Sequence, residues 1–172
     1  MLNREEIREL IKDKQLITDY LNLDIQLTPN GFDLTAGSVF EFSSLGALDF
    51  SNKQRVIPQT KEVRLKKENP QDKFGWWNLK KGAYKIRTNE VFNLPKDLAV
   101  ISFPRSSLLR MGAFTQTAVW DAGFTGRSEF ILVAENPKGL RLKQNARIIQ
   151  AIFISMKETN LGYQGIYQMN PP

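Results

Sequence analysis

Apolar and polar positions along most of the chain alternate in short stretches that end at turn residues. This pattern is typical of β-strands. It predicts strands at residues 23–26, 32–42, 55–58, 62–67, 84–88, 98–103, 129–134 and 140–142. The near-continuous apolar run within residues 146–156 predicts a further strand, buried on both faces. Many short strands with turns at regular spacing indicate a β-sandwich or a barrel.

One segment near the N-terminus follows a helical period instead. Ile7, Leu10 and Ile11 fall on one helical face, and Asn3 can cap a helix that ends at about Asp13. We expect this helix to pack against the β-structure. A second feature is the pair Trp76 and Trp77, which could stack on a base but more often anchors a core or an interface.

Length and charge narrow the class of protein. The 172 residues suit one domain with a sizeable core, with a helical segment at residues 1–22 and a C-terminal tail at residues 158–172. A net charge of +6 would suit nucleic acid. However, the basic residues at positions 53–67 are interspersed with acids, and no RNA-binding signature appears. We therefore expect no nucleic-acid partner.

The chain contains neither cysteine nor histidine. It therefore has no disulfide framework and none of the ligands that zinc-dependent deaminases use. No apolar run reaches the ~20 residues of a membrane span, and the N-terminal residues are too polar for a signal peptide. We expect a cytoplasmic protein with no membrane partner.

Residues 103–112 have the composition of an anion-binding turn. Pro104 fixes the chain before a helix start, Ser106 or Ser107 can cap it, and residues 108–111 form about one turn that stops at Gly112. The N–H groups and positive end of such a helix attract phosphates. An ordinary capped turn is the alternative interpretation.

Two arginines strengthen the phosphate interpretation. Arg105 offers a bidentate donor beside the two serine hydroxyls. Arg110 lies four residues after Ser106 and returns to the same helical face.

Residues 119–126 predict a tight hairpin with one acid in it. Asp121 lies between Trp120 and Phe124, and Gly123 and Gly126 allow the turn. We expect the Asp121 carboxylate to be half-buried, where it could orient a water molecule. Alternatively, it makes hydrogen bonds within the turn.

Five segments in the same order resemble the dCTP deaminase and trimeric dUTPase superfamily, and most closely its archaeal-type dUTPases. They are NGFDL at residues 30–34, PRSSLLRMG at 104–112, WDAGFTG at 120–126, ARIIQA at 146–151 and YQGIYQ at 163–168. Each is weak alone, but together they span roughly residues 25–170. The resemblance implies a mainly β fold: a distorted, jelly-roll-like dUTPase barrel with an N-terminal helix and a short central helix.

One departure from the family pattern bears on the activity. Deaminases of this superfamily carry a catalytic glutamate ten residues after the hairpin aspartate, where this chain has Ile131. Glu129 would lie on the same strand face but about 6–7 Å away, too far to move a proton at the same atom. We expect deamination to be lost. A dCTP deaminase or a bifunctional enzyme, with Glu129 as the sole candidate acid, is the alternative.

The resemblance then implies a dUTP diphosphatase that converts dUTP and water to dUMP and diphosphate. Asp121 would orient the water as the catalytic residue, with Mg²⁺ held through the triphosphate and not by direct protein ligands. Phe124 would pack on the deoxyribose, and backbone groups of residues 118–124 would read uracil. Asp33 would be a structural carboxylate near the site. The expected substrate-binding residues are Arg105, Ser106, Ser107, Arg110, Ala118, Trp120, Phe124, Glu129, Gln150, Tyr163 and Tyr167.

The resemblance also implies a homotrimer whose sites lie at subunit interfaces. The C-terminal tail would close over the nucleotide, as mobile polar tails can. Ile166 replaces the usual lysine of this tail, which removes one phosphate-binding charge. A non-catalytic nucleotide-binding regulator is a further alternative.

Overall fold

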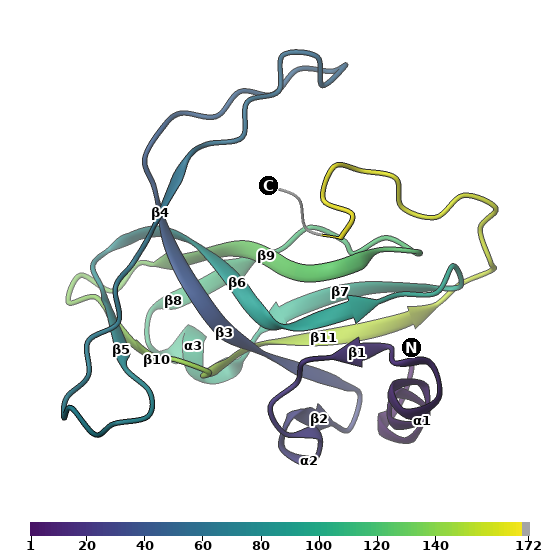
Figure 1. Cartoon of the computed structure of the whole chain (residues 1–172), viewed down its shortest axis with the longest axis horizontal. Helices are drawn as coiled ribbons and strands as arrows, with labels where there is room; N and C mark the ends of the chain where they lie inside the picture. Colours follow the sequence, from purple (N-terminus) through teal and green to yellow (C-terminus); the bar gives the residue numbers. More distant parts are fainter. Residues whose placement is uncertain (170–172) are drawn as a thin grey trace.

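The structure is a computed structural model, and it describes residues 1–169 (Figure 1). Its centre is an antiparallel sheet that nearly closes on itself. Across the sheet, the main strands are β7 (Leu98–Pro104), β11 (Arg147–Ser155), β3 (Gly31–Phe42), β6 (Gly82–Asn93), β9 (Thr125–Ala134) and β8 (Ala113–Gln116). A bridge between Val100 in β7 and Trp120 after β8 links the two ends of this order.

Shorter strands complete the barrel. β1 (Ile17–Thr18) pairs with β6, whereas β2 (Leu27–Thr28) and β4 (Thr60–Glu62) pair with β3. β5 (Trp76–Leu79) and β10 (Leu140–Lys143) form a separate two-stranded sheet. The mainly β, barrel-like fold predicted from the sequence is confirmed.

Both predicted helices are present. In α1 (Arg4–Lys14), the Asn3 side chain accepts a hydrogen bond from the Glu6 amide while the Glu6 carboxylate accepts one from the Asn3 amide. This reciprocal capping box fixes the start of the helix, and Ile7 and Ile11 bury its inner face. The short central helix is α3 (Ser106–Arg110), between β7 and β8.

Some predicted strands are wrong. Residues 23–26 form the helix α2 (Leu23–Gln26), because the Asn22 side chain caps the Ile25 amide. The segment 55–58 contributes only a bridge at Val56. Of the predicted strand 62–67, only Glu62 lies in a strand, and Lys66 makes a single bridge to Trp76.

Residues 43–59 form an arm that projects from the barrel (Figure 1). A bridge between Ala47 and Val56 joins its two sides. Leu48 and Phe50 near its tip are largely exposed. The arm therefore stands apart from the main hydrophobic core.

The core fills the inside of the barrel. Phe32, Ile86 and Leu132 are fully buried on three neighbouring strands. Phe92 packs edge-on against both Trp120 and Phe153, a favoured aromatic geometry. Trp77 is buried and its indole N–H donates to the Val63 carbonyl at 3.0 Å, so the core interpretation of this tryptophan is confirmed.

None of the helices formed within residues 1–169 has both the length and the apolar character that a membrane crossing requires. Residues 170–172 of the predicted C-terminal tail lie outside the described residues.

Candidate functional site

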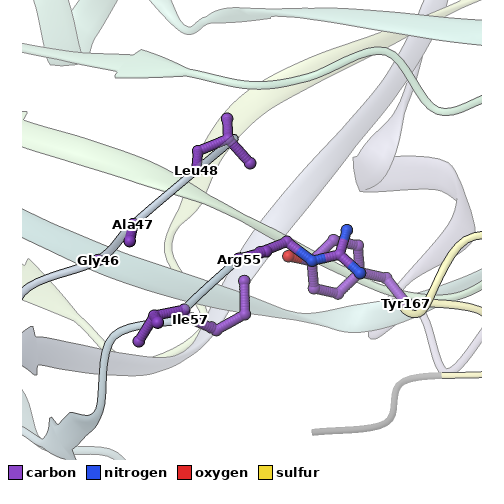
Figure 2. Close-up of a pocket in the computed structure, with 7 residues that line it drawn as sticks. Gly46, Ala47, Leu48, Arg55, Ile57 and Tyr167 are labelled. Carbon is purple, nitrogen blue, oxygen red and sulfur yellow. The ribbon is translucent and has the colours of Figure 1, made fainter. Parts of the chain in front are cut away.

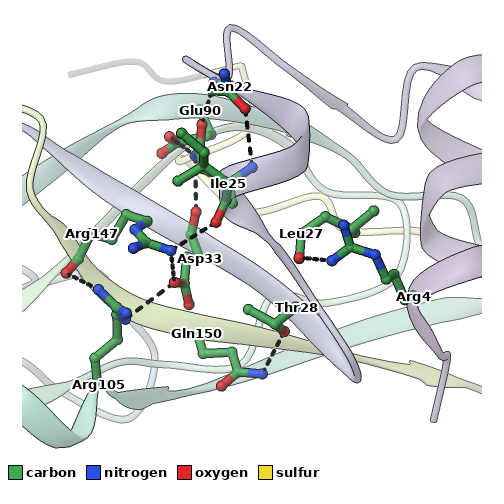
Figure 3. A network of polar contacts seen from close by, with 11 residues as sticks. Arg4, Asn22, Ile25, Leu27, Thr28, Asp33, Glu90, Arg105, Arg147 and Gln150 are labelled. Atoms are coloured by element: carbon green, nitrogen blue, oxygen red, sulfur yellow. Dashed lines mark hydrogen bonds and ion pairs between the residues drawn. The ribbon is translucent and has the colours of Figure 1, made fainter.

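A buried carboxylate joins two arginines where three strands meet (Figure 3). Asp33 on β3 lies opposite Gln150 of β11, and its side chain is only 3% exposed. One oxygen, Oδ2, lies 3.1 Å from the Arg105 Nε atom and 3.1 Å from an Arg147 terminal nitrogen. Arg105 also donates to the Arg147 carbonyl at 3.4 Å. The predicted first and second motifs are therefore in direct contact.

Two opposing effects act on the Asp33 carboxyl. Burial raises its pKa above the ordinary value, while the charges of Arg105 and Arg147 and the hydrogen bond from Arg147 lower it. Burial is the larger effect, because each guanidinium is about one-third exposed and water screens its charge. Sequence reasoning missed Arg147 as a site residue, although it lies within the fourth motif.

A second buried acid lies nearby and was also missed. The Glu90 carboxylate on β6 accepts three hydrogen bonds. They come from the Gln26 side-chain amide at 2.7 Å, the Thr35 hydroxyl at 2.6 Å and the Thr35 backbone amide at 2.9 Å. Burial raises the pKa of its carboxyl, against the lowering effect of these bonds. Glu90 lies two residues after Thr88 and two before Phe92, so it shares their inward face of β6. This two-residue period was the sequence signal for its burial.

The serine turn is exposed, but its capping differs from the prediction. α3 begins at Ser106 with Arg105 as the N-cap residue, and no side-chain hydrogen bond caps it in the structure of residues 1–169. The predicted cap by Ser106 or Ser107 is therefore wrong, since both lie inside the helix. Gly112 ends it with φ +74°, as predicted. Ser106, Ser107 and Arg110 are exposed on this turn.

Gln150 is held beside the same strands. Its side-chain amide donates to the Thr28 hydroxyl at 2.8 Å (Figure 3). It also donates to the Asn30 side chain at 3.3 Å. Gly31 lies directly against this side chain, because a Cβ atom there would lie 3.1 Å from the Gln150 Nε2 atom and 2.3 Å from the Ala151 carbonyl oxygen. Arg105, directly after β7, thus binds the Asp33 carboxylate, and Gln150 on β11 lies opposite Asp33 in the pairing of β11 with β3.

Asp121 is placed differently from the prediction. Trp120 and Phe124 are buried, but Asp121 is exposed and not half-buried. Residues 117–124 form a loop with a single bridge at Trp120 and not a regular hairpin. Among residues 1–169, the Asp121 carboxylate has neither a hydrogen bond nor an ion pair. Its backbone carbonyl accepts from the Phe124 amide at 3.1 Å, which closes the turn.

Ala118 is exposed on the same loop, and the C-terminal tail lies against the turn that follows it. The Tyr163 amide donates to the Ala122 carbonyl at 2.8 Å, and the Tyr163 ring meets Phe124 edge-on at 5.5 Å. Tyr167 instead lines an open pocket of about 500 Å³ against Arg55 and other arm residues (Figure 2). The predicted tail residues therefore border both the loop and the arm.

The predicted site residues form two groups within one chain. Asp33, Arg105, Ser106, Ser107 and Gln150 gather where β7 ends. Asp121 follows Trp120, which bridges to Val100 near the start of β7. Arg105 lies five positions after Val100 along β7 and its end, about 16 Å at the usual rise of a strand. One chain therefore does not bring Asp121 to the serine turn.

Strand β9 carries Glu129, the candidate acid for deamination. Glu129 and Ile131 point to the same outer face, while Ser128, Phe130 and Leu132 are buried. Glu129 forms an ion pair with Lys85 at 3.1 Å. The pairing of β6 with β9 shifts register between Arg87 and Val91, and the extra residues lie in β6 and not in β9. The shift therefore does not bring Glu129 into the position of Ile131.

Comparison with protein families adds the decisive observation. The family model described as dCTP deaminase-like matches residues 1–156. The chain belongs to this family. It is 44% identical over 168 residues to a probable deoxyuridine 5'-triphosphate nucleotidohydrolase of Archaeoglobus fulgidus, covering 98% of this chain and 95% of that protein. It is 33% identical to the deoxyuridine 5'-triphosphate nucleotidohydrolase of Methanocaldococcus jannaschii, covering 83% and 87%.

A solved structure agrees with the fold. The 2'-deoxycytidine 5'-triphosphate deaminase of Agrobacterium tumefaciens superposes with a TM-score of 0.61 at 22% identity. The match covers 88% of this chain and 46% of the deaminase chain. This similarity supports the dCTP deaminase-like barrel.

Proposed function

We propose that this chain hydrolyses dUTP to dUMP and diphosphate. The observation that carries the proposal is the exposed Asp121 carboxylate. Asp33 is bound to two arginines and Glu129 to Lys85, whereas Asp121 has no side-chain partner within residues 1–169 and is available to a water molecule. The names of the relatives in Archaeoglobus fulgidus and Methanocaldococcus jannaschii support the same substrate.

In the proposed reaction, Asp121 orients a water molecule toward the α-phosphorus of dUTP. A bond forms between the water oxygen and this phosphorus while the water gives up a proton to the Asp121 carboxylate, and the bond from phosphorus to the bridging oxygen breaks. Diphosphate leaves with that oxygen. Donors that stabilise charge on the phosphates lower the barrier. We assign this role to the exposed Ser106, Ser107 and Arg110, together with Arg105.

Arg105 is oriented for this role by its contact with Asp33. The carboxylate occupies its Nε atom and the Arg147 carbonyl one terminal nitrogen. An arginine has five N–H donors, so donors remain for a phosphate oxygen. We also propose that Gln150, beside the same carboxylate, contacts the phosphates.

We propose that Mg²⁺ binds at this site as part of the substrate complex. Residues 1–169 contain no group of three or more acidic side chains arranged to hold a metal ion, and Asp33 is engaged by two guanidinium groups. We propose that the triphosphate holds Mg²⁺, which would neutralise phosphate charge there.

We further propose that a second copy of the chain completes each site in a homotrimer. A water molecule can bridge groups only over hydrogen-bonding distances, and about 16 Å of β7 separates the two groups of site residues. Exposed apolar side chains beside α3 support an interface there. They are Phe103, Leu109, Met111 and Phe114.

The sugar and base would bind at the loop that contains Asp121. We propose that Phe124 packs against the deoxyribose and excludes a 2'-hydroxyl by steric clash. Residues 118–124 would read uracil mainly through their backbone groups.

Deamination of dCTP is the competing function. It needs a carboxylate that moves protons between water and the base. Ile131 occupies the expected position, and the ion pair with Lys85 holds Glu129 elsewhere on the same face. These observations favour hydrolysis without deamination.

Replacement of the catalytic acid separates an enzyme from a nucleotide-binding regulator. In Asp121→Asn we expect the kcat for dUTP to fall at least about 100-fold, with the Kd for a non-hydrolysable imido analogue changed less than about threefold. The matched control is Asp97→Asn, another exposed acid, which should keep its kcat. Full activity in Asp121→Asn would refute the proposed mechanism.

A further inference from the structure

The C-terminal tail uses the backbone polar groups of the turn at residues 122–125. Ala122 and Gly123 belong to the loop that the proposed function assigns to the base, and Thr125 follows that loop directly as the first residue of β9. Four hydrogen bonds connect the two segments. They run from the Tyr163 amide to the Ala122 carbonyl at 2.8 Å, from the Gln168 side chain to the Gly123 carbonyl at 2.9 Å, from the Thr125 amide to the Gln168 side chain at 3.0 Å, and from the Met169 amide to the Thr125 carbonyl at 2.7 Å.

The Gln168 carboxamide matches the edge of a pyrimidine imide. Its Nε2 atom donates to the Gly123 carbonyl, and its Oε1 atom accepts from the Thr125 amide. The two partners fix this orientation, since a carbonyl needs a donor and an amide needs an acceptor. Uracil carries the same adjacent pair, an N–H donor beside a carbonyl oxygen. The side chain therefore satisfies the groups that a uracil edge would satisfy.

The tail also covers the proposed sugar platform. The Tyr163 ring lies edge-on against Phe124, which is only 7% exposed. Gly162 and Gly123 approach closely beside it, so that a Cβ atom on Gly123 would lie 2.8 Å from the Gly162 Cα atom. A deoxyribose could reach the Phe124 face only after Tyr163 moves.

We propose that, without nucleotide, residues 162–169 occupy the nucleoside-binding surface of their own chain, which consists of the turn at residues 122–125 and the Phe124 ring. Gln168 then takes the place of the base. The inference rests on the proposed function, because it takes the loop as the uracil site. The docked tail and the nucleotide then compete for this surface. The apparent affinity for nucleotide is lowered in proportion to the fraction of chains in which the surface is uncovered. The tail therefore acts as an internal competitor before it could close over a bound substrate.

Substitution of Gln168 tests the competition. Gln168→Ala removes both hydrogen bonds, so we expect the KM for dUTP to fall by about three- to tenfold. Gln168→Glu places a second oxygen against the Gly123 carbonyl and should lower the KM as well. Gln164→Ala is the matched control, because Gln164 is an exposed tail glutamine without a side-chain hydrogen bond within residues 1–169. An unchanged or higher KM in both Gln168 variants would overturn the inference.

Hydrogen exchange on the unmodified protein gives an independent readout. We expect saturating deoxyuridine to speed exchange at the Tyr163 and Met169 amides, since the nucleoside displaces the tail. Slower exchange at both amides would overturn the inference and indicate a tail that closes over the ligand. If dUTP were hydrolysed while the tail became protected, this inference alone would fail. If neither binding of deoxyuridine nor hydrolysis of dUTP occurred, the proposed function would fail with it.

Discussion

The Asp33 carboxylate lies 3.1 Å from the Arg105 Nε atom and holds the guanidinium beside the serine turn. The two residues come from segments about seventy positions apart. Because the carboxylate is buried and the guanidinium is about one-third exposed, the pair connects the interior of the barrel to its surface. The contact gives Asp33 a role in positioning Arg105.

Removal of the Asp33 charge should affect the site more than the fold. In Asp33→Asn we expect the KM for dUTP to rise about three- to tenfold, because Arg105 loses a charge-assisted hydrogen bond. Both guanidinium groups are about one-third exposed, so the substitution leaves no fully buried unpaired charge and the free energy of unfolding should change by less than about 1 kcal/mol. Steady-state kinetics and urea unfolding measure the two effects.

A surface pair supplies the control for this variant. Asp24 forms an exposed ion pair with Arg8 at 2.9 Å, so Asp24→Asn should leave both the KM and the stability nearly unchanged. A large loss of stability in Asp33→Asn with normal kinetics would instead make the buried pair structural.

The Glu90 carboxyl should make stability depend on pH. Burial raises its pKa above the ordinary value of 4.5, so in the window just above pH 4.5 the folded chain binds more protons than the unfolded chain. Glu90 therefore makes its full contribution to the free energy of unfolding below about pH 4.5, and this contribution is lost as pH rises through the pKa of Glu90 in the folded chain.

Glu90→Gln cannot titrate, which makes the variant a measure of this effect. Its destabilisation relative to the unsubstituted chain should be larger at pH 4.5 than at pH 7, as measured by urea unfolding at a series of pH values. A destabilisation that grows with pH would mean that the hydrogen bonds from Gln26 and Thr35 outweigh burial.

The local parts of the fold could be predicted from the sequence. Asn3 and Glu6 define the start of α1 within one turn, and the apolar run at residues 146–156 identifies β11. Residues 23–26 were wrong because alternating apolar residues over four positions fit a strand as well as one helical turn. The Asn22 side chain caps the start of this segment, which favours the helix over the strand.

The electrostatics of the site could not be predicted in the same way. Thr35 and Glu90 meet because β3 and β6 pair side by side, and sequence pattern alone does not fix the register of strands so far apart. Asp121 was expected to be half-buried between two aromatic residues. Trp120 and Phe124 do turn inward, but the loop leaves the carboxylate between them exposed.

Mixed oligomers test whether two chains share a site. Asp121→Asn and Arg110→Ala should each be nearly inactive, and neither residue has a side-chain partner within residues 1–169 whose loss would disturb the fold. After the two variants are unfolded and refolded together, about a quarter of the sites in a symmetric oligomer would combine both intact residues. Activity should recover toward that fraction. If mixing restored nothing although mixed oligomers formed, both residues would serve the same chain.

We propose that the chain hydrolyses dUTP and does not deaminate dCTP. The most direct measurement supplies purified protein with Mg²⁺ and either dUTP or dCTP, and follows diphosphate and ammonia separately. We predict diphosphate from dUTP and no ammonia from dCTP. Ammonia from dCTP would contradict the assignment of Ile131 to the missing acid position, and absence of diphosphate from dUTP would contradict the proposed activity itself.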